Sequence, residues 1–243
     1  MFSKSNLSKY FYIISVVFLV LFCFFIVQMV VVFFIRAGLE SGILSDALLE
    51  STAIQFGLSV LIYVLTLCLI LGIFQILQGP IKNFKTLLGA KRAPKLLDLC
   101  YSLAGYGAYF GLSLIALATV AIFVPGFNAQ EKQSVGFEQV SSQIEYAMAF
   151  IVLVVLAPVI EEAIFRGFLF TKIRQKISFW PTAIIVSLVF GLVHLQWNVG
   201  IDVFMLSLVA CFLRENTKVI WAGIGVHMLK NFLAFAILFL HIA

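Results

Sequence analysis

The chain has 243 residues, of which 63% are hydrophobic and 11% are charged, whereas an ordinary soluble domain carries about 25% charged residues. Its mean hydropathy is +1.13, so the composition excludes a soluble monomer and favours an integral membrane protein. The net charge of +5 does not indicate nucleic-acid binding, because the basic residues lie in short loops between apolar runs.

Seven apolar runs follow one another along the chain. The first four each exceed the ~20 residues that cross a bilayer, and they are 10–35, 52–77, 99–123 and 146–170. The first is too long for a signal peptide and is predicted to be a retained span. Two shorter runs follow at 182–195 and 201–213, and the last is 219–240. We predict an all-α, polytopic membrane helix bundle of about seven (6–8) transmembrane helices, with a re-entrant hairpin as the alternative for the short pair.

The loops between the runs differ in charge, which predicts an orientation. Basic side chains dominate 79–98, 171–180 and the turn at 214–218, whereas 36–51 and 124–145 carry more acidic ones. Because cytoplasmic loops are enriched in Lys and Arg, seven crossings with the N-terminus in the cytoplasm satisfy every loop. The bases of loop 79–98 are interpreted as setting this topology, and an amphipathic segment on anionic lipid is the alternative.

Glu161, Glu162 and Arg166 lie inside the fourth apolar run, where each charge costs ~2.5–3.5 kcal/mol on the helix-insertion scale. Glu162 and Arg166 are four residues apart, so they share a helical face and are predicted to form a buried ion pair. Glu161 lies about 100° further round the helix, and the pair does not explain it. A buried carboxyl of this kind either takes up a proton or has a function.

Two later runs carry polar side chains at a similar predicted depth. Measured from the basic loops at ~1.5 Å per residue, Glu161 lies about 15 Å deep, His194 about 20 Å, His227 about 14 Å and Asn231 about 20 Å. All four are near the midplane of a ~30 Å hydrocarbon core, so we expect them to meet at one site. The third histidine, His241, is predicted to be interfacial.

A carboxylate, two imidazoles and an amide are compatible with two chemistries. One is metal-free hydrolysis, in which a glutamate takes a proton from water while His and Asn stabilise the oxyanion. The other is a zinc site with His and Glu ligands and a bound water. The helical zinc pattern HExxH, the GxSxG serine motif and the Walker glycine loop are absent from the sequence, so the metal-free chemistry is favoured, with no cofactor and no metal ligand.

Three short motifs occur in order in the second half of the chain. APVIEEAIFRG at 157–167 resembles the EExxxR motif of the CAAX prenyl protease and bacteriocin-processing family, also called CPBP or Abi intramembrane proteases. FGLVH at 190–194 matches that family's FxxxH motif, and HMLKN at 227–231 matches its HxxxN motif. The resemblance predicts a catalytic core at 146–243, preceded by N-terminal transmembrane helices and loops at 1–145, in one integrated membrane domain.

The resemblance also implies roles around a water-filled catalytic cavity inside the bundle. The implied catalytic residues are Glu161, His194, His227 and Asn231, and the implied supporting residues are Glu162, Arg166 and Phe190. Glu161 is the general base that activates water, and His194 assists it. His227 and Asn231 form the oxyanion-stabilising side, while Phe190 is a packing residue.

The sequence therefore predicts a membrane-embedded, metal-independent peptidase of the CAAX protease or bacteriocin-processing type. Eukaryotic members of the family cleave prenylated CAAX proteins, and bacterial relatives are linked to bacteriocin maturation or self-immunity. The expected partners are the lipid bilayer and a peptide or protein substrate, lipidated or membrane-associated, and not nucleic acid. The short loops favour a prokaryotic cell (inner) membrane.

Two other functions compete with this prediction. The first alternative is a non-enzymatic membrane scaffold or bacteriocin self-immunity protein that uses the same polar cavity for binding. The second is a proton-coupled transporter, which would also use buried carboxylates. The transporter ranks last because the polar residues crowd into the second half of the chain, without the paired repeats that such proteins carry.

Overall fold

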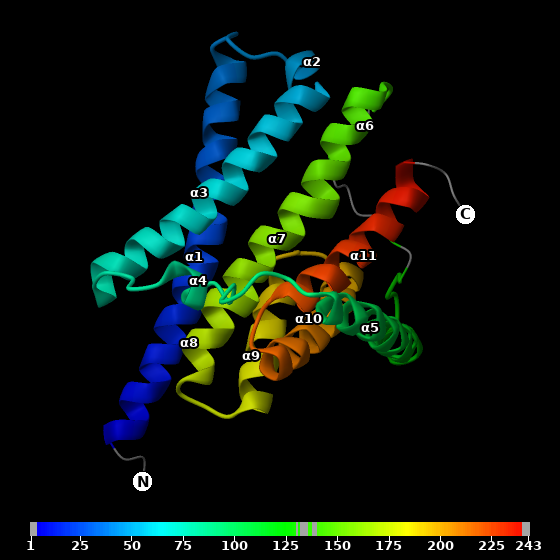
Figure 1. Ribbon diagram of the computed structural model, residues 1–243. Coiled ribbons are helices and arrows are strands. Elements are labelled where there is room, and N and C mark those ends of the chain that lie inside the picture. Colours follow the sequence, from blue (N-terminus) through cyan, green and yellow to red (C-terminus); the bar gives the residue numbers. More distant parts are fainter. Residues whose placement is uncertain (1–3, 130, 132–135, 138–139, 240–243) are drawn as a thin grey trace. The chain divides into compact units, whose positions relative to one another are not determined.

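The computed structural model describes residues 4–129, 131, 136–137 and 140–239, so His241 lies outside the described part. Within that part the regular elements are all helices (Figure 1), which confirms the all-α prediction. Contacts divide the chain into two compact units. Unit 1 comprises residues 1–21, 81–133 and 161–227, and unit 2 comprises residues 22–80, 134–160 and 228–243.

Six helices of the described residues are long and apolar enough to cross a membrane, namely Leu7–Glu40, Thr52–Gln78, Leu96–Phe123, Gln143–Arg174, Trp197–Thr217 and Trp221–Phe239. They coincide with six of the predicted runs and confirm a multi-pass membrane protein. The remaining run is α9 (Phe179–Leu192), whose 14 residues fall short of the ~20 that cross a bilayer unaided.

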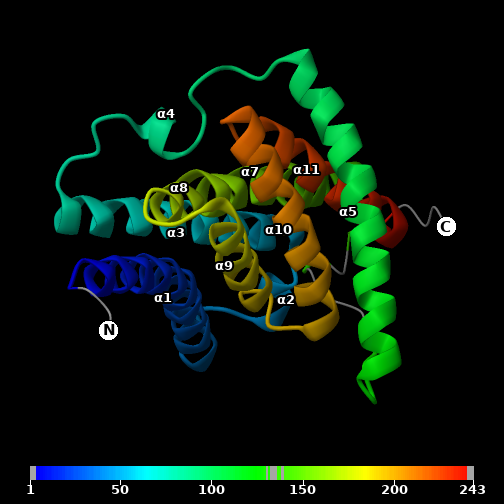
Figure 2. The same ribbon diagram turned by 90° about the horizontal axis from the view of Figure 1, so that it is seen from below.

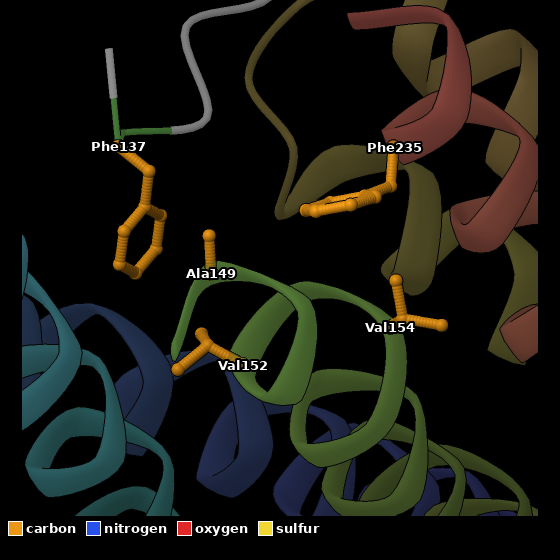
Figure 3. Packing of buried hydrophobic residues seen from close by; sticks show 5 residues of the cluster. All are labelled: Phe137, Ala149, Val152, Val154 and Phe235. Atoms are coloured by element: carbon orange, nitrogen blue, oxygen red, sulfur yellow. The ribbon is translucent and has the colours of Figure 1, made fainter. Parts of the chain in front are cut away.

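Unit 2 contains most of α1 (Lys4–Glu40), the short α2 (Asp46–Leu49) and the long α3 (Thr52–Gln78), which packs on α6 (Gln143–Phe150) and on the π-helical segment η1 (Ile151–Leu156). Ser142 and Glu145 form a capping box that starts α6. The buried core of unit 2, shown in Figure 3, consists of Phe137, Ala149, Val152, Val154 and Phe235. Phe235 comes from α11 (Trp221–Phe239).

The helix that carries the two glutamates is continuous from Gln143 to Arg174 but changes its hydrogen-bonding pattern twice. After α6 and η1 it continues as α7 (Ala157–Glu162), the second π-helical segment η2 (Ala163–Leu169) and α8 (Phe170–Arg174). The π-helical segments therefore stand directly before and after α7, at whose end the glutamates lie. Such segments are rare and are frequent at functional sites.

In unit 1, α10 (Trp197–Thr217) packs on α9 and on α5 (Leu96–Phe123), as Figure 2 shows. Small residues let these helices approach each other, as is common between membrane helices. A Cβ on Gly191 would lie 2.9 Å from the Gly200 carbonyl oxygen, at the turn between α9 and α10. A Cβ on Gly105 of α5 would lie 2.9 Å from both Leu213 and Val226 side chains.

The segment that precedes α5, residues 84–92, is docked onto unit 1 and is called the strap. It begins with α4 (Phe84–Leu87) and reaches Gly89, whose φ of +75° suits glycine. The Gly89 carbonyl accepts a hydrogen bond of 3.1 Å from the Ile220 N–H, and the Arg92 carbonyl accepts one of 2.6 Å from the Trp221 indole. The structure thus gives the strap a packing role in addition to its charges.

The basic loops of the sequence come together within unit 1. The strap meets the α10–α11 turn through the Gly89–Ile220 hydrogen bond. Next to this turn, the end of α10 meets the end of α8 through the ion pair of Arg174 and Glu215, with 3.0 Å between Nη2 and Oε1. Lys9 of α1 lines a cleft together with Arg174. These four basic segments lie at one end of unit 1, as the orientation argument expects of loops on one side of a membrane.

Candidate active site

Glu162 and Arg166 form the predicted ion pair, with 2.8 Å between Arg166 Nη1 and Glu162 Oε1. Both side chains are fully buried, and the contact is ionic, without the alignment of a hydrogen bond. A pair of this kind is costly to break, because removing one partner leaves a buried charge uncompensated. The rest of the site is built around this pair.

His227 of α11 lies between the two glutamates. Its Nδ1 is 3.4 Å from Glu162 Oε1, and its Nε2 is 3.8 Å from Glu161 Oε2. Only 3% of His227 is exposed, and Glu161 is 8% exposed. The distance to Glu161 is too long for a direct hydrogen bond, but a single oxygen atom can lie about 2.8 Å from both groups at once.

Phe190 connects the histidines to the ion pair. Its fully buried ring lies 5.1 Å from the His194 ring and 5.8 Å from the His227 ring, both edge to face. The Arg166 guanidinium carbon is 4.4 Å from the Phe190 ring centre, in a cation–π arrangement. The ring therefore contacts one residue of each of the other two motifs, so its packing orders the site.

His194 lies in a different kind of element from the one that the sequence predicted. The apolar run was expected to continue as a helix to residue 195, but α9 ends at Leu192, so the prediction that His194 lies within a membrane helix is wrong. Leu195 has a φ of +54°, which a right-handed helix does not allow. His194 is half-buried in the turn, where its Nδ1 is 2.8 Å from the Phe190 carbonyl oxygen.

Asn231 belongs to unit 2, one helical turn after His227 along α11. Its side-chain amide donates a hydrogen bond of 2.8 Å to the Leu153 carbonyl in η1. A side-chain amide has two N–H donors, so this bond uses one of them. The participation of Asn231 in catalysis stays a prediction, as do the catalytic roles of Glu161, His194 and His227 and the internal cavity around them.

Two residues that the sequence analysis passed over contact the motif. A Cβ on Gly223, one turn before His227, would lie 2.8 Å from Glu162 Oε2, so only glycine leaves room for this carboxylate. Arg214, interpreted above as a loop base, is only 7% exposed, and its Nε donates a hydrogen bond of 3.2 Å to the Arg166 carbonyl. A glycine inside an apolar run is the signal that marks such close approaches.

The Arg214 contact follows from the change of helix type. At the end of η2, the Phe170 N–H donates to the Phe165 carbonyl, five residues back. Where i→i+5 bonding returns to i→i+4 bonding, one carbonyl loses its backbone donor. The next carbonyl in the chain is that of Arg166, and the Arg214 guanidinium donates to it. A buried carbonyl that would otherwise lack a donor is thereby satisfied.

Among the described residues, no three His, Cys, Asp or Glu side chains are grouped so that they could hold a metal ion. The two carboxylates and His227 are close, but Glu162 is engaged with Arg166. The donor set is thus one carboxylate and one imidazole facing each other, with a second carboxylate neutralised by an arginine. This arrangement suits proton transfer and oxyanion stabilisation.

Comparisons with known proteins find similarity in the second half of the chain. Residues 143–233 match the model of the family described as type II CAAX prenyl endopeptidase Rce1-like. A curated relative named "Putative membrane peptidase YdiL", from Bacillus subtilis (strain 168), is 25% identical over 138 residues, which are 56% of this chain and 54% of the relative. The match thus spans about half the length of that relative, and no solved structure matches the chain. Residues 143–233 hold all three motifs, so both comparisons support the resemblance of this part of the chain to the CAAX prenyl protease and bacteriocin-processing (CPBP) family.

Proposed function

We propose that the chain is a membrane-embedded peptidase of the CAAX protease or bacteriocin-processing type, in which Glu161 activates a water molecule without a metal ion. The observation that carries the proposal is the opposition of Glu161 Oε2 and His227 Nε2 across 3.8 Å. Both groups are nearly buried, and a proton acceptor and a proton donor facing each other form the minimal set for hydrolysis.

The proposed reaction proceeds through a tetrahedral intermediate. The Glu161 carboxylate takes a proton from water as the water oxygen bonds to the scissile carbonyl carbon. The carbonyl oxygen becomes an oxyanion, which accepts a hydrogen bond from His227. The carbon–nitrogen bond then breaks, and the proton held by Glu161 passes to the leaving amine. The attacking oxygen and the oxyanion sit on one carbon, so a base and a donor a few ångströms apart can serve both.

The other motif residues take positioning or assisting roles in this proposal. Glu162 and Arg166 orient His227 through Nδ1, the ring nitrogen that faces Glu162 at 3.4 Å. His194 assists Glu161, and Asn231 contributes a second donor to the oxyanion. Residues 146–243 form the catalytic core that these roles require.

The substrate is proposed to be a peptide or protein held at the membrane, with a lipidated C-terminus as the first candidate because of the CAAX-type family. The chain is proposed to lie in a prokaryotic cell membrane with its N-terminus in the cytoplasm. The grouping of four basic segments at one end of unit 1 supports this orientation. The site then opens toward the cytoplasmic side.

The test uses purified full-length protein in detergent with a farnesylated CAAX-type peptide and its unprenylated counterpart. Release of the C-terminal tripeptide is followed by mass spectrometry. Glu161→Gln is expected to lower the rate by about 10²–10⁴-fold, the usual loss when a general base is removed. Glu40→Gln, an exposed carboxyl of α1, is the matched control and is expected to leave the rate unchanged.

Three outcomes would contradict all or part of the proposal. If wild type and Glu161→Gln cleave at the same rate, Glu161 is not the base. If folded wild-type protein binds the peptides without cleaving them, and Glu161→Gln binds equally well, the non-enzymatic scaffold or immunity function replaces the peptidase. Loss of cleavage on chelation, restored by zinc, would overturn the metal-free chemistry while leaving the peptidase in place.

A further inference from the structure

A cleft of about 790 Å³ opens within unit 1, between the first turns of α1 and the α8–α9 loop. None of the residues that line it belongs to the three sequence motifs. Six of its lining residues matter here, three basic and three aliphatic, and they are Lys9, Arg174, Lys176, Ile13, Ile14 and Ile185.

The basic side chains give the cleft a positive charge, because none of the described residues that line it is acidic. The Lys176 ammonium lies 4.9 Å from the centre of the Tyr12 ring, and the Lys9 ammonium lies 5.1 Å from the Tyr10 ring. These contacts hold the cations without neutralising them. Arg174 is paired with Glu215, which does not line the cleft. The Arg174 side chain is 39% exposed. The cleft therefore favours an anionic ligand.

The aliphatic side chains give the same cleft an apolar wall. Ile13 is buried, Ile185 is half-buried and Ile14 is 65% exposed. An inorganic anion would gain nothing from this wall, whereas a hydrocarbon chain would be removed from contact with polar groups. A ligand that suits both halves carries an anionic head and an acyl chain.

The cleft also lies at the level where such ligands are found. It belongs to the end of unit 1 at which the four basic segments meet. Tyr10 lines it and is 46% exposed, and Trp180, next to the lining residue Pro181, is 65% exposed. Exposed Tyr and Trp at the ends of membrane helices mark the headgroup layer, and basic pockets between helices there bind anionic headgroups.

We propose that this cleft binds an anionic phospholipid, with the phosphate at Lys9, Arg174 and Lys176 and one acyl chain along Ile14 and Ile185. This inference goes beyond the proposed peptidase activity and does not depend on it. The helix Gln143–Arg174, which carries Glu161 and Glu162, is called the motif helix. The bound lipid joins α1 to the loop that follows the motif helix, so it acts as a structural ligand of unit 1.

The test measures lipid retention by native mass spectrometry. Purified full-length protein is equilibrated in micelles that hold phosphatidylglycerol and phosphatidylcholine in equal amounts. Wild type is expected to retain phosphatidylglycerol preferentially. Each lysine near an anionic headgroup strengthens binding by about fivefold, so the double variant Lys9→Gln/Lys176→Gln is expected to lose about thirtyfold in affinity for phosphatidylglycerol.

The matched control is Lys82→Gln/Lys91→Gln, which removes two exposed lysines outside the cleft. Thermal unfolding confirms that each variant is folded. If the cleft variant does not fold, Ile14→Gln, at an exposed position of the apolar wall, replaces it and is expected to weaken lipid retention alone. Equal retention by the cleft and control variants, or equal retention of both lipids by wild type, overturns the proposal. Complete displacement of the lipid by inorganic phosphate would show an anion site instead and overturns it too.

Discussion

The carboxylate of Glu162 lies against Arg166, His227 and Gly223, so its position depends on three neighbours at once. The arginine neutralises it, the histidine faces it through Nδ1, and the glycine leaves the space that it occupies. A change in any of the three moves the group that is proposed to orient His227.

Gly223→Ala is expected to impair the site more than the fold. The added methyl would lie 2.8 Å from Glu162 Oε2, and this carboxylate cannot retreat without stretching its ion pair with Arg166. We expect a stability loss of about 1–3 kcal/mol from overpacking and a larger proportional loss of peptide cleavage. Gly107→Ala in α5, where nothing lies within 4 Å of the new methyl, is the control. Full activity of Gly223→Ala would show that the carboxylate has room to move.

Arg166→Ala is expected to cost about 3–5 kcal/mol, because it leaves the fully buried Glu162 without its counter-charge. Thermal unfolding in detergent measures the effect. Arg174→Ala breaks the partly exposed pair with Glu215 and should cost at most about 1 kcal/mol. If the two variants are equally stable, the buried pair is not a structural element of the motif helix.

For single residues, the sequence predicted the ion pair of Glu162 and Arg166 but not the close approach of Gly223 to Glu162. Glu162 and Arg166 are neighbours because they are four apart on one helix, a relation that is readable from spacing alone. The contact of Gly223 with Glu162 depends on how α11 crosses the motif helix, and the buried position of Arg214 depends on the packing of α10. Crossings of this kind are not encoded in the local pattern of either helix.

The strap and the motif helix meet at two glycines. A Cβ on Gly167, next to Arg166, would clash with the Leu88 carbonyl oxygen and lie 2.6 Å from the carbonyl carbon. Because these are backbone atoms, the strap could accommodate such a methyl only by moving away. The strap thus packs directly on the π-helical segment η2.

Gly167→Ala is therefore expected to loosen the strap. We expect a destabilisation of about 1–3 kcal/mol, together with faster amide hydrogen exchange at Gly89 and Ile220, whose backbones are joined by a hydrogen bond. Gly107→Ala again serves as the control, since a glycine-to-alanine change in an open helical position stabilises by about 0.5–1 kcal/mol. Unchanged exchange at Ile220 in Gly167→Ala would mean that the strap docks independently of this contact.

Helix ends were the least predictable feature among the elements. Hydropathy placed each long helix to within a few residues, but it assigned His194 to a helix that stops at Leu192. An apolar residue with a positive φ, such as Leu195, gives no sign of the turn in its own identity. The π-helical segments were also not predicted, since their apolar composition is that of any buried helix.

The distribution of charge over the whole chain leads to a test of topology. In a variant whose four natural cysteines are serine, single cysteines at Lys82 and Lys176 are expected to react with a membrane-impermeant maleimide from the same side. Cysteines at Glu40 and Asn128 are expected to react from the other side. The labelling is measured in oriented vesicles whose permeability to the maleimide has been determined.

Different failures of this test have different meanings. Opposite sides for Lys82 and Lys176 would contradict the meeting of basic loops in unit 1. Correct grouping with both pairs inverted would preserve the fold and refute only the cytoplasmic N-terminus. For the whole molecule, composition and loop charge sufficed to predict a helical multi-pass protein, whereas the division into two compact units could not be inferred, because each unit gathers segments that are distant in sequence.

The π-helical segment η2 has a consequence for the kinds of mutation that the motif tolerates. A π-turn is an α-helix with one residue too many, so deleting one residue from 163–165 would allow regular α-helical bonding to resume. Because a π-turn holds about one residue more than an α-turn, the lost residue and the return to α-helical bonding nearly cancel, and the helix on either side keeps its orientation. Arg166 would then follow Glu162 by three residues, a spacing that still shares one face of an α-helix. The loss of one residue from 163–165 is therefore expected to preserve the ion pair, whereas the same loss from a purely α-helical segment would rotate the residues beyond it by about 100°.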